Sequence, residues 1–149
     1  MKYTEKITKR LNDLLEKNYD AEKGYQTAAN NVNNSALKNY FESRAKERYD
    51  FGHELKNEIK LYGETPEKGT SFTADAHRVW MNFRAALSNN DEEAILKETI
   101  RGEKSFIKEY NDILEMSSLP ESTKRLILKH RSVALSALED VKKFESIEA

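Results

Sequence analysis

The stretch RGEKSFIKEY, residues 101–110, decides the fold class of this chain. Glu103, Phe106 and Tyr110 recur at intervals of three and four residues, the spacing of one face of an α-helix. Ile95 and Ile113 extend the same stripe in both directions. The pattern predicts a helix whose buried face carries a carboxylate among apolar and aromatic side chains.

Helical spacing also dominates the rest of the chain, and no strong pattern has the two-residue period of a strand. We therefore predict an all-α protein with about three-quarters or more of its residues in helices. The apolar stripes predict five helices. The stripes run over residues 7–32, 35–62, 72–87, 95–113 and 127–144.

Capping signals mark the expected breaks between these helices. The run Asn30–Asn34 ends the first helix and caps the second, and Gly63 stops the second. Asn90, with Glu93 three residues on, has the spacing of a capping box for the fourth helix. The run Ser118–Glu121 repeats that spacing before the fifth helix, with a proline in the first turn.

The predicted lengths set the topology. Four helices of roughly 26–30 residues would each be about 40–45 Å long. Short links near residues 33 and 118 make two antiparallel hairpins, and the long connection, which holds the short 72–87 helix, can run the length of the bundle. The result is an up-down-down-up four-helix bundle with one crossover, built from a single domain over residues 1–149.

The composition narrows the class of partner. The chain has 25 basic and 26 acidic residues and a formal net charge of −1, so no global field favours nucleic acid or an anionic membrane. It has no cysteine, which excludes disulfides, thiolate metal sites and a cysteine nucleophile. The N-terminus has no apolar signal core and no segment is long and apolar enough for a membrane span. We expect a cytoplasmic protein without nucleic-acid or membrane partners.

The spacing of Glu103 and Tyr110 after Gly102 resembles that of ferritin-like and rubrerythrin-like bundles, and so does the second-helix stretch YFESRAKER, residues 40–48. Including Gly24-Tyr25 and Trp80, the chain resembles over nearly its full length a bacterial ferritin-like four-helix-bundle family of unknown function. The resemblance implies a ferritin-like fold and points to the position where relatives hold a di-metal centre.

Four positions depart from the ligand pattern that the resemblance implies. Arg48 stands at the ligand glutamate of the second helix, and Phe51 stands at its histidine three residues on. Asn18 occupies the slot seven residues before Tyr25, and Ile127 stands three residues before His130 where a glutamate is expected. A di-metal site needs four acids and two histidines, and a guanidinium would repel both cations. The site is therefore predicted to be degenerate.

Two hypotheses follow. In the first, the bundle is non-catalytic and metal-free and serves as an interaction or stress-related module, with Arg48 paired to Glu103 and with Asn18 and His130 as hydrogen-bonding neighbours. Its predicted polar core cluster is Asn18, Tyr25, Arg48, Glu103, Tyr110 and His130. In the second, a divergent carboxylate protein holds iron or another divalent metal and handles iron or peroxide. Its ligands would be Glu22, Glu98, Glu103 and His130.

The remaining candidates favour ordinary packing. His53 and His77 lie off the inner stripes, which predicts solvated or boundary positions. The short helix Phe72–Leu87 carries an aromatic stripe that includes Trp80 and Phe83, and we expect it to pack across the outside of the bundle. If that stripe were exposed, it would be covered in a homodimer. No sequence feature identifies a protein partner.

Overall fold

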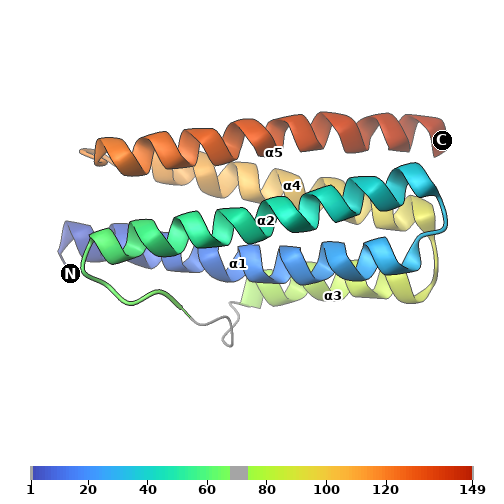
Figure 1. Ribbon diagram of the computed structural model, residues 1–149, viewed down its shortest axis with the longest axis horizontal. Helices are drawn as coiled ribbons and strands as arrows, with labels where there is room; N and C mark the ends of the chain where they lie inside the picture. Colours follow the sequence, from blue (N-terminus) through green and yellow to red (C-terminus); the bar gives the residue numbers. More distant parts are fainter. Residues whose placement is uncertain (1, 68–73, 149) are drawn as a thin grey trace.

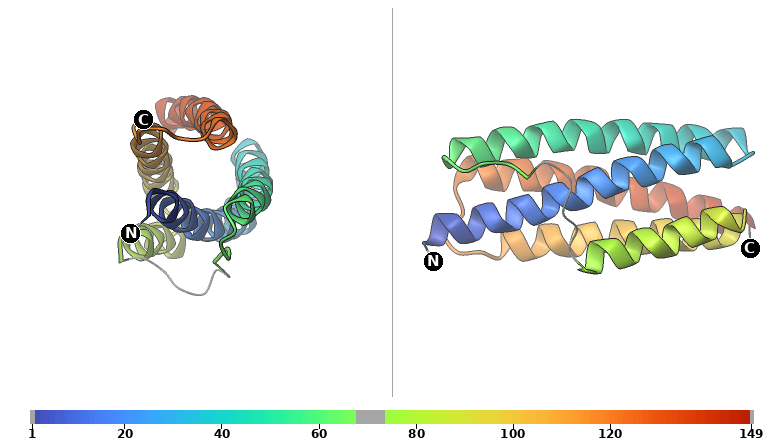
Figure 2. Two further views of the ribbon diagram at one scale, coloured as in Figure 1. Left: turned by 90° about the vertical axis from the view of Figure 1, so that its left-hand side faces the viewer. Right: turned by 90° about the horizontal axis from the view of Figure 1, so that it is seen from below.

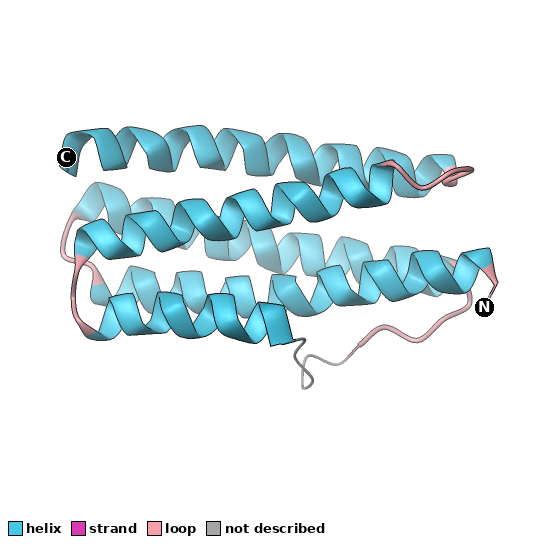
Figure 3. Cartoon of the chain, turned by 180° about the vertical axis from the view of Figure 1, so that it is seen from behind, coloured by secondary structure: helices cyan, strands magenta, loops and turns pink. Residues whose placement is uncertain are grey.

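The computed structural model describes residues 2–67 and 74–148, with side chains described outside 74–80 and 147–148. These residues form helices joined by loops, and no strand occurs among them (Figure 3). The all-α prediction is thus confirmed for the described ranges. The helices are α1 Tyr3–Asn31, α2 Ser35–Leu61, α3 Ala74–Ser88, α4 Glu92–Leu114 and α5 Glu121–Glu148.

The four long helices lie side by side around a common core, and α3 lies outside them against α1 and α4 (Figure 2). Following the chain in Figure 1, α1 and α5 run in one direction while α2 and α4 run in the other. The closest pairings are α1 with α2 and α4 with α5, so the bundle consists of two antiparallel hairpins. The link between the hairpins brings the chain back along the bundle before α4 begins.

Helix α2 begins and ends at the residues that the sequence indicates. The side chain of Asn34 accepts a hydrogen bond from the backbone N–H of Leu37 at 3.1 Å and caps α2. Gly63 has a φ of 78°, a left-handed conformation that favours glycine, and its N–H donates to the carbonyl of Lys60. The two residues fix the ends of α2.

Both predicted capping boxes of the second hairpin are wrong. The cap of α4 is Asp91, whose side chain accepts from the N–H of Ala94 at 3.1 Å, while Asn90 lies in the turn with a φ of 50°. Ser118 likewise has a positive φ of 58°, and α5 begins only at Glu121. An N-cap residue needs an extended backbone, which these two residues lack. α4 has 23 residues rather than the expected 26–30, because it begins one residue later than a cap at Asn90 implies and already ends at Leu114.

Two apolar clusters fill the bundle, one toward each end. The first contains Tyr25, Phe41 and Leu96, and the second contains Leu11, Leu55 and Ile113. Between them, about halfway along the helices, lie four buried polar side chains, one from each long helix. These are Asn18, Arg48, Glu103 and His130. Arg48 and Glu103 are the two charged members of this internal layer.

The short helix α3 packs against the outside of the bundle, as predicted. Phe83, Ala86 and Leu87 are buried, and the Phe83 ring meets the rings of Tyr25 and Phe41 edge-on. Within the described side chains, the aromatic stripe is thus covered inside one chain. Phe72, His77 and Trp80 lie outside the described residues or side chains.

In the described part of the chain, no helix is long and apolar enough to span a bilayer.

Candidate functional site

An ion pair between α2 and α4 forms the centre of the polar layer. The Nη2 atom of Arg48 donates to both carboxylate oxygens of Glu103, at 2.7 Å to Oε1 and 2.6 Å to Oε2. Both side chains are 0% exposed. The helical period turns both residues inward, and they meet at the same depth in the bundle. The predicted contact is present.

Two buried tyrosines complete this pair. The hydroxyl of Tyr25 on α1 donates to Oε1 of Glu103, and Nη1 of Arg48 donates to the hydroxyl of Tyr110 at 3.2 Å. Both tyrosines are buried, with exposures of 5% and 0%. The Glu103 carboxylate thus accepts hydrogen bonds from a guanidinium and a phenol. A buried charge needs such hydrogen-bond partners to offset the loss of water.

Aromatic rings enclose the guanidinium. Its carbon lies 4.1 Å from the centroid of the Phe106 ring and 5.8 Å from that of Phe51. Arginine has the delocalised, weakly hydrated cation that suits such contacts. One nitrogen of the guanidinium is not hydrogen-bonded: Nε of Arg48 is buried and has no hydrogen-bond partner.

Electrostatics keep the arginine charged and the phenols neutral. Burial on its own acts to lower the pKa of Arg48, but the surrounding groups, with Glu103 first, raise that pKa above its usual value. Burial, with a further contribution from Glu103, raises the pKa of Tyr25 well above its usual value and that of Tyr110 to about 12. The cluster therefore holds a fixed internal cation, and its two phenols are not suited to exchange protons near neutrality.

His130 lies next to the cluster without joining its hydrogen bonds, contrary to the prediction. Its imidazole is fully buried and stacks on the ring of Phe51, with centroids 3.8 Å apart and planes at 10°. Neither ring nitrogen has a hydrogen-bond partner, and the nearest acid oxygen is Oε1 of Glu54, 3.6 Å from Nε2. Burial, with the charges of Arg48 and Lys129, lowers the pKa of His130 to about 3, so the ring is neutral.

Asn18 also stays apart from the ion pair. Its Nδ2 donates to the backbone carbonyl of Leu14 at 3.0 Å, one turn earlier in α1, and its Oδ1 has no hydrogen-bond partner. The prediction that Asn18 bonds to Arg48 and Glu103 is wrong, because the amide N–H donates to a carbonyl of its own helix instead. The structure thus joins four of the six predicted cluster residues by hydrogen bonds: Tyr25, Arg48, Glu103 and Tyr110.

The residues of this layer do not fit a metal centre. Glu103 is occupied by Arg48 and Tyr25, Glu98 pairs with Arg101 at 3.4 Å, and Glu22 is half-buried. Among the described residues, no three histidine, aspartate or glutamate side chains converge as a metal-binding group. The cation of Arg48 would also repel a metal placed beside Glu103.

One acid beside the cluster was missed in the sequence. Glu47 on α2 is largely buried, pairs with Arg44 at 3.2 Å, and has an Oε1 without a hydrogen-bond partner. Burial and the nearby Glu103 raise its pKa to about 7, against the opposing effects of Arg48 and Arg44. Two features of the sequence could have identified Glu47: it is adjacent to Arg48 on the same helix, and Arg44 lies about one turn earlier.

The fold and the site together define an all-helical bundle protein with a charged, hydrogen-bonded centre. The chain belongs to the family described as Domain of unknown function (DUF2383), whose model matches residues 6–116. That segment contains Tyr25, Arg48, Glu103 and Tyr110, whereas His130 and the whole of α5 lie beyond it. Comparisons with curated proteins and with solved structures gave no match.

Proposed function

We propose that this protein is a non-catalytic ferritin-like bundle in which an internal ion pair takes the place of a di-metal site. It would act in the cytoplasm as an interaction or stress-related module rather than as an enzyme. The observation that carries this proposal is the fully buried contact of Arg48 with both oxygens of Glu103.

Two further features support the proposal. The opposed directions of α2 and α1, and the common direction of α2 and α4, agree with a single-crossover bundle of the ferritin-like kind (Figure 1). In addition, Tyr25 donates to the carboxylate that a metal would otherwise bind. A guanidinium and a phenol together supply donors to this carboxylate, so Glu103 is hydrogen-bonded by protein groups alone.

The alternative is a divergent metal protein that binds iron or another divalent ion. One observation favours it: the buried ring nitrogens of His130 lack hydrogen-bond partners, and neutral imidazole is a common metal ligand. Such a site would need Glu103 to leave Arg48, which would remain as an unpaired buried cation.

Elemental analysis of protein purified without chelator, followed by titration with ferrous iron in air, separates the two. The proposal predicts no stoichiometric metal and an oxidation rate equal to that of buffer. Stoichiometric iron, or oxidation that the Glu103→Gln variant loses, would contradict it and support the metal-binding alternative.

A further inference from the structure

The outward face of α2 carries a row of alternating charges at intervals of four residues. The row is Lys38, Glu42, Lys46 and Asp50, and all four side chains are exposed. Opposite charges at this spacing are close enough to pair along a helix. Within the part of the chain that the structure describes, however, none of the four makes an ion pair or a side-chain hydrogen bond.

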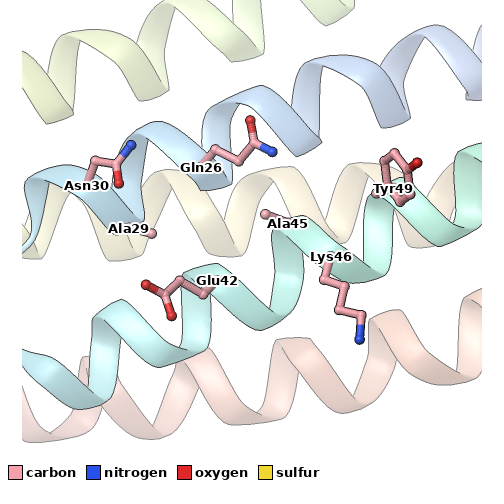
Figure 4. A pocket seen from close by; sticks show the side chains of 7 residues that line it. All are labelled: Gln26, Ala29, Asn30, Glu42, Ala45, Lys46 and Tyr49. Carbon is pink, nitrogen blue, oxygen red and sulfur yellow. The ribbon is translucent and has the colours of Figure 1, made fainter.

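This row borders a groove of about 410 Å³ between α1 and α2 (Figure 4). Ala29 and Ala45 line the groove with small side chains, which leave room for another chain to come close. Tyr49 also lines it and is 52% exposed, with its ring edge-on to His53. The groove thus combines small residues, a half-exposed aromatic ring and unpaired charges.

We propose that a second copy of this chain docks here, with the two α2 helices antiparallel across a twofold axis at the level of residue 44. In that register Lys38 faces the partner's Asp50, and Glu42 faces the partner's Lys46. The axis repeats both contacts, so four ion pairs form from one row. A self-complementary surface of this kind is what a twofold interface requires.

The charge order also excludes the neighbouring arrangements. Moving the antiparallel register by one helical turn sets Lys46 against its own copy and Glu42 against the partner's Asp50. An axis parallel to α2 sets every charge against its own copy. Like charges at such distances disfavour these alternatives, so the row specifies one register.

Apolar burial would supply most of the affinity, because exposed ion pairs contribute little by themselves. Tyr49 can bury a large area, and the small side chains of the groove allow close helix approach. A standard interface needs about 800 Å² per partner, roughly a tenth of the 8334 Å² surface of the chain. The 27 residues of α2 extend over about 40 Å, which is long enough for such a contact.

The α2 face is a better candidate for a homodimer than the Phe72–Leu87 segment. Phe83 and Leu87 are already buried within one chain, whereas the groove and charged row are open. The inference is independent of whether the core binds metal.

Sedimentation velocity over a concentration series at low salt tests the proposal, with Lys46→Glu as the decisive variant. The wild-type chain should form dimers. Lys46→Glu sets acids opposite each other twice and should weaken dimerisation by at least about tenfold. The swapped variant Glu42→Lys/Lys46→Glu restores opposite charges in the same register and should recover the dimer.

Lys104→Glu, an equal charge change on the exposed face of α4, is the matched control and should leave dimerisation unchanged. A wild-type chain that stays monomeric would overturn the proposal. So would a dimer that Lys46→Glu affects no more than Lys104→Glu does, or a swapped variant that fails to recover.

Discussion

His130 of α5 stacks face to face on Phe51 of α2, with ring centroids 3.8 Å apart. Phe51 is the position at which the sequence resemblance leads one to expect a second histidine. The Phe51 ring packs against the one buried histidine of this layer, and the Tyr110 ring lies at 71° to the imidazole. The core thus uses imidazole for its shape rather than for its basicity.

His130 should make the fold sensitive to acid. Its pKa is lowered from 6.5 to about 3, so between these values the unfolded chain binds a proton that the folded chain does not. The stabilising contribution is complete above pH 6.5 and is lost as the pH falls. Urea unfolding on both sides of pH 6.5 should show this loss, and His130→Leu should reduce the slope. Imidazole resonances of His130 that titrate near pH 6.5 would contradict the expectation.

Arg48→Met should leave the buried Glu103 carboxylate without its cationic partner and lower the unfolding free energy by about 3–5 kcal/mol. The double variant Arg48→Met/Glu103→Leu removes both charges and should recover most of that loss. Chemical denaturation of the four proteins in this cycle measures the coupling. Additive losses would show that the two side chains do not interact in solution.

Glu47 should act in the opposite sense to His130. Its pKa is raised from 4.5 to about 7, so the folded chain binds the extra proton in that window and the fold loses stability as the pH rises through it. Glu47→Gln should therefore be more stable than the wild type above pH 7 and similar to it near pH 4.5. Glu93→Gln, the same substitution at an exposed site on α4, is the control for the loss of one carboxylate.

The sequence was sufficient to predict the Arg48–Glu103 ion pair but not the contacts of the polar side chains around it. Helical spacing shows that Arg48 and Glu103 face inward, and opposite charges buried at one depth must meet. The same spacing gives no side-chain torsion angles, so it could not show that Asn18 bonds to its own helix or that His130 stacks on Phe51. Periodicity fixes the face of a helix, whereas rotamers depend on the assembled neighbours.

The helix ends show a similar limit. Asn90 and Asp91 are adjacent and both suit an N-cap, and Glu93 made Asn90 the better choice by capping-box spacing. The turn after α3 instead places Asn90 at a φ of 50°, which asparagine tolerates, and leaves Asp91 to cap α4. The choice depends on how α3 meets the bundle, which local sequence does not determine.

Phe83 should anchor α3. Its ring is 6% exposed and meets Tyr25 and Phe41, so Phe83→Ala should cost about 3–5 kcal/mol. Met81 on the same helix is 56% exposed, and Met81→Ala should change stability by less than about 0.5 kcal/mol. Hydrogen exchange should show loss of protection in α3 for the first variant alone. Equal effects of the two substitutions would mean that α3 is not held by Phe83.

Thermal unfolding during a divalent-metal titration tests most directly whether Arg48 takes the place of a metal beside Glu103. A ligand that binds only the folded chain raises the melting temperature, and the rise grows with the ratio of its concentration to its Kd. The wild-type protein should show no change with ferrous or manganous ions under anaerobic conditions. Arg48→Glu restores an acid and should gain a weak, metal-dependent rise. A rise in the wild type that Glu103→Gln abolishes would contradict the claim that Arg48 stands where a metal would bind.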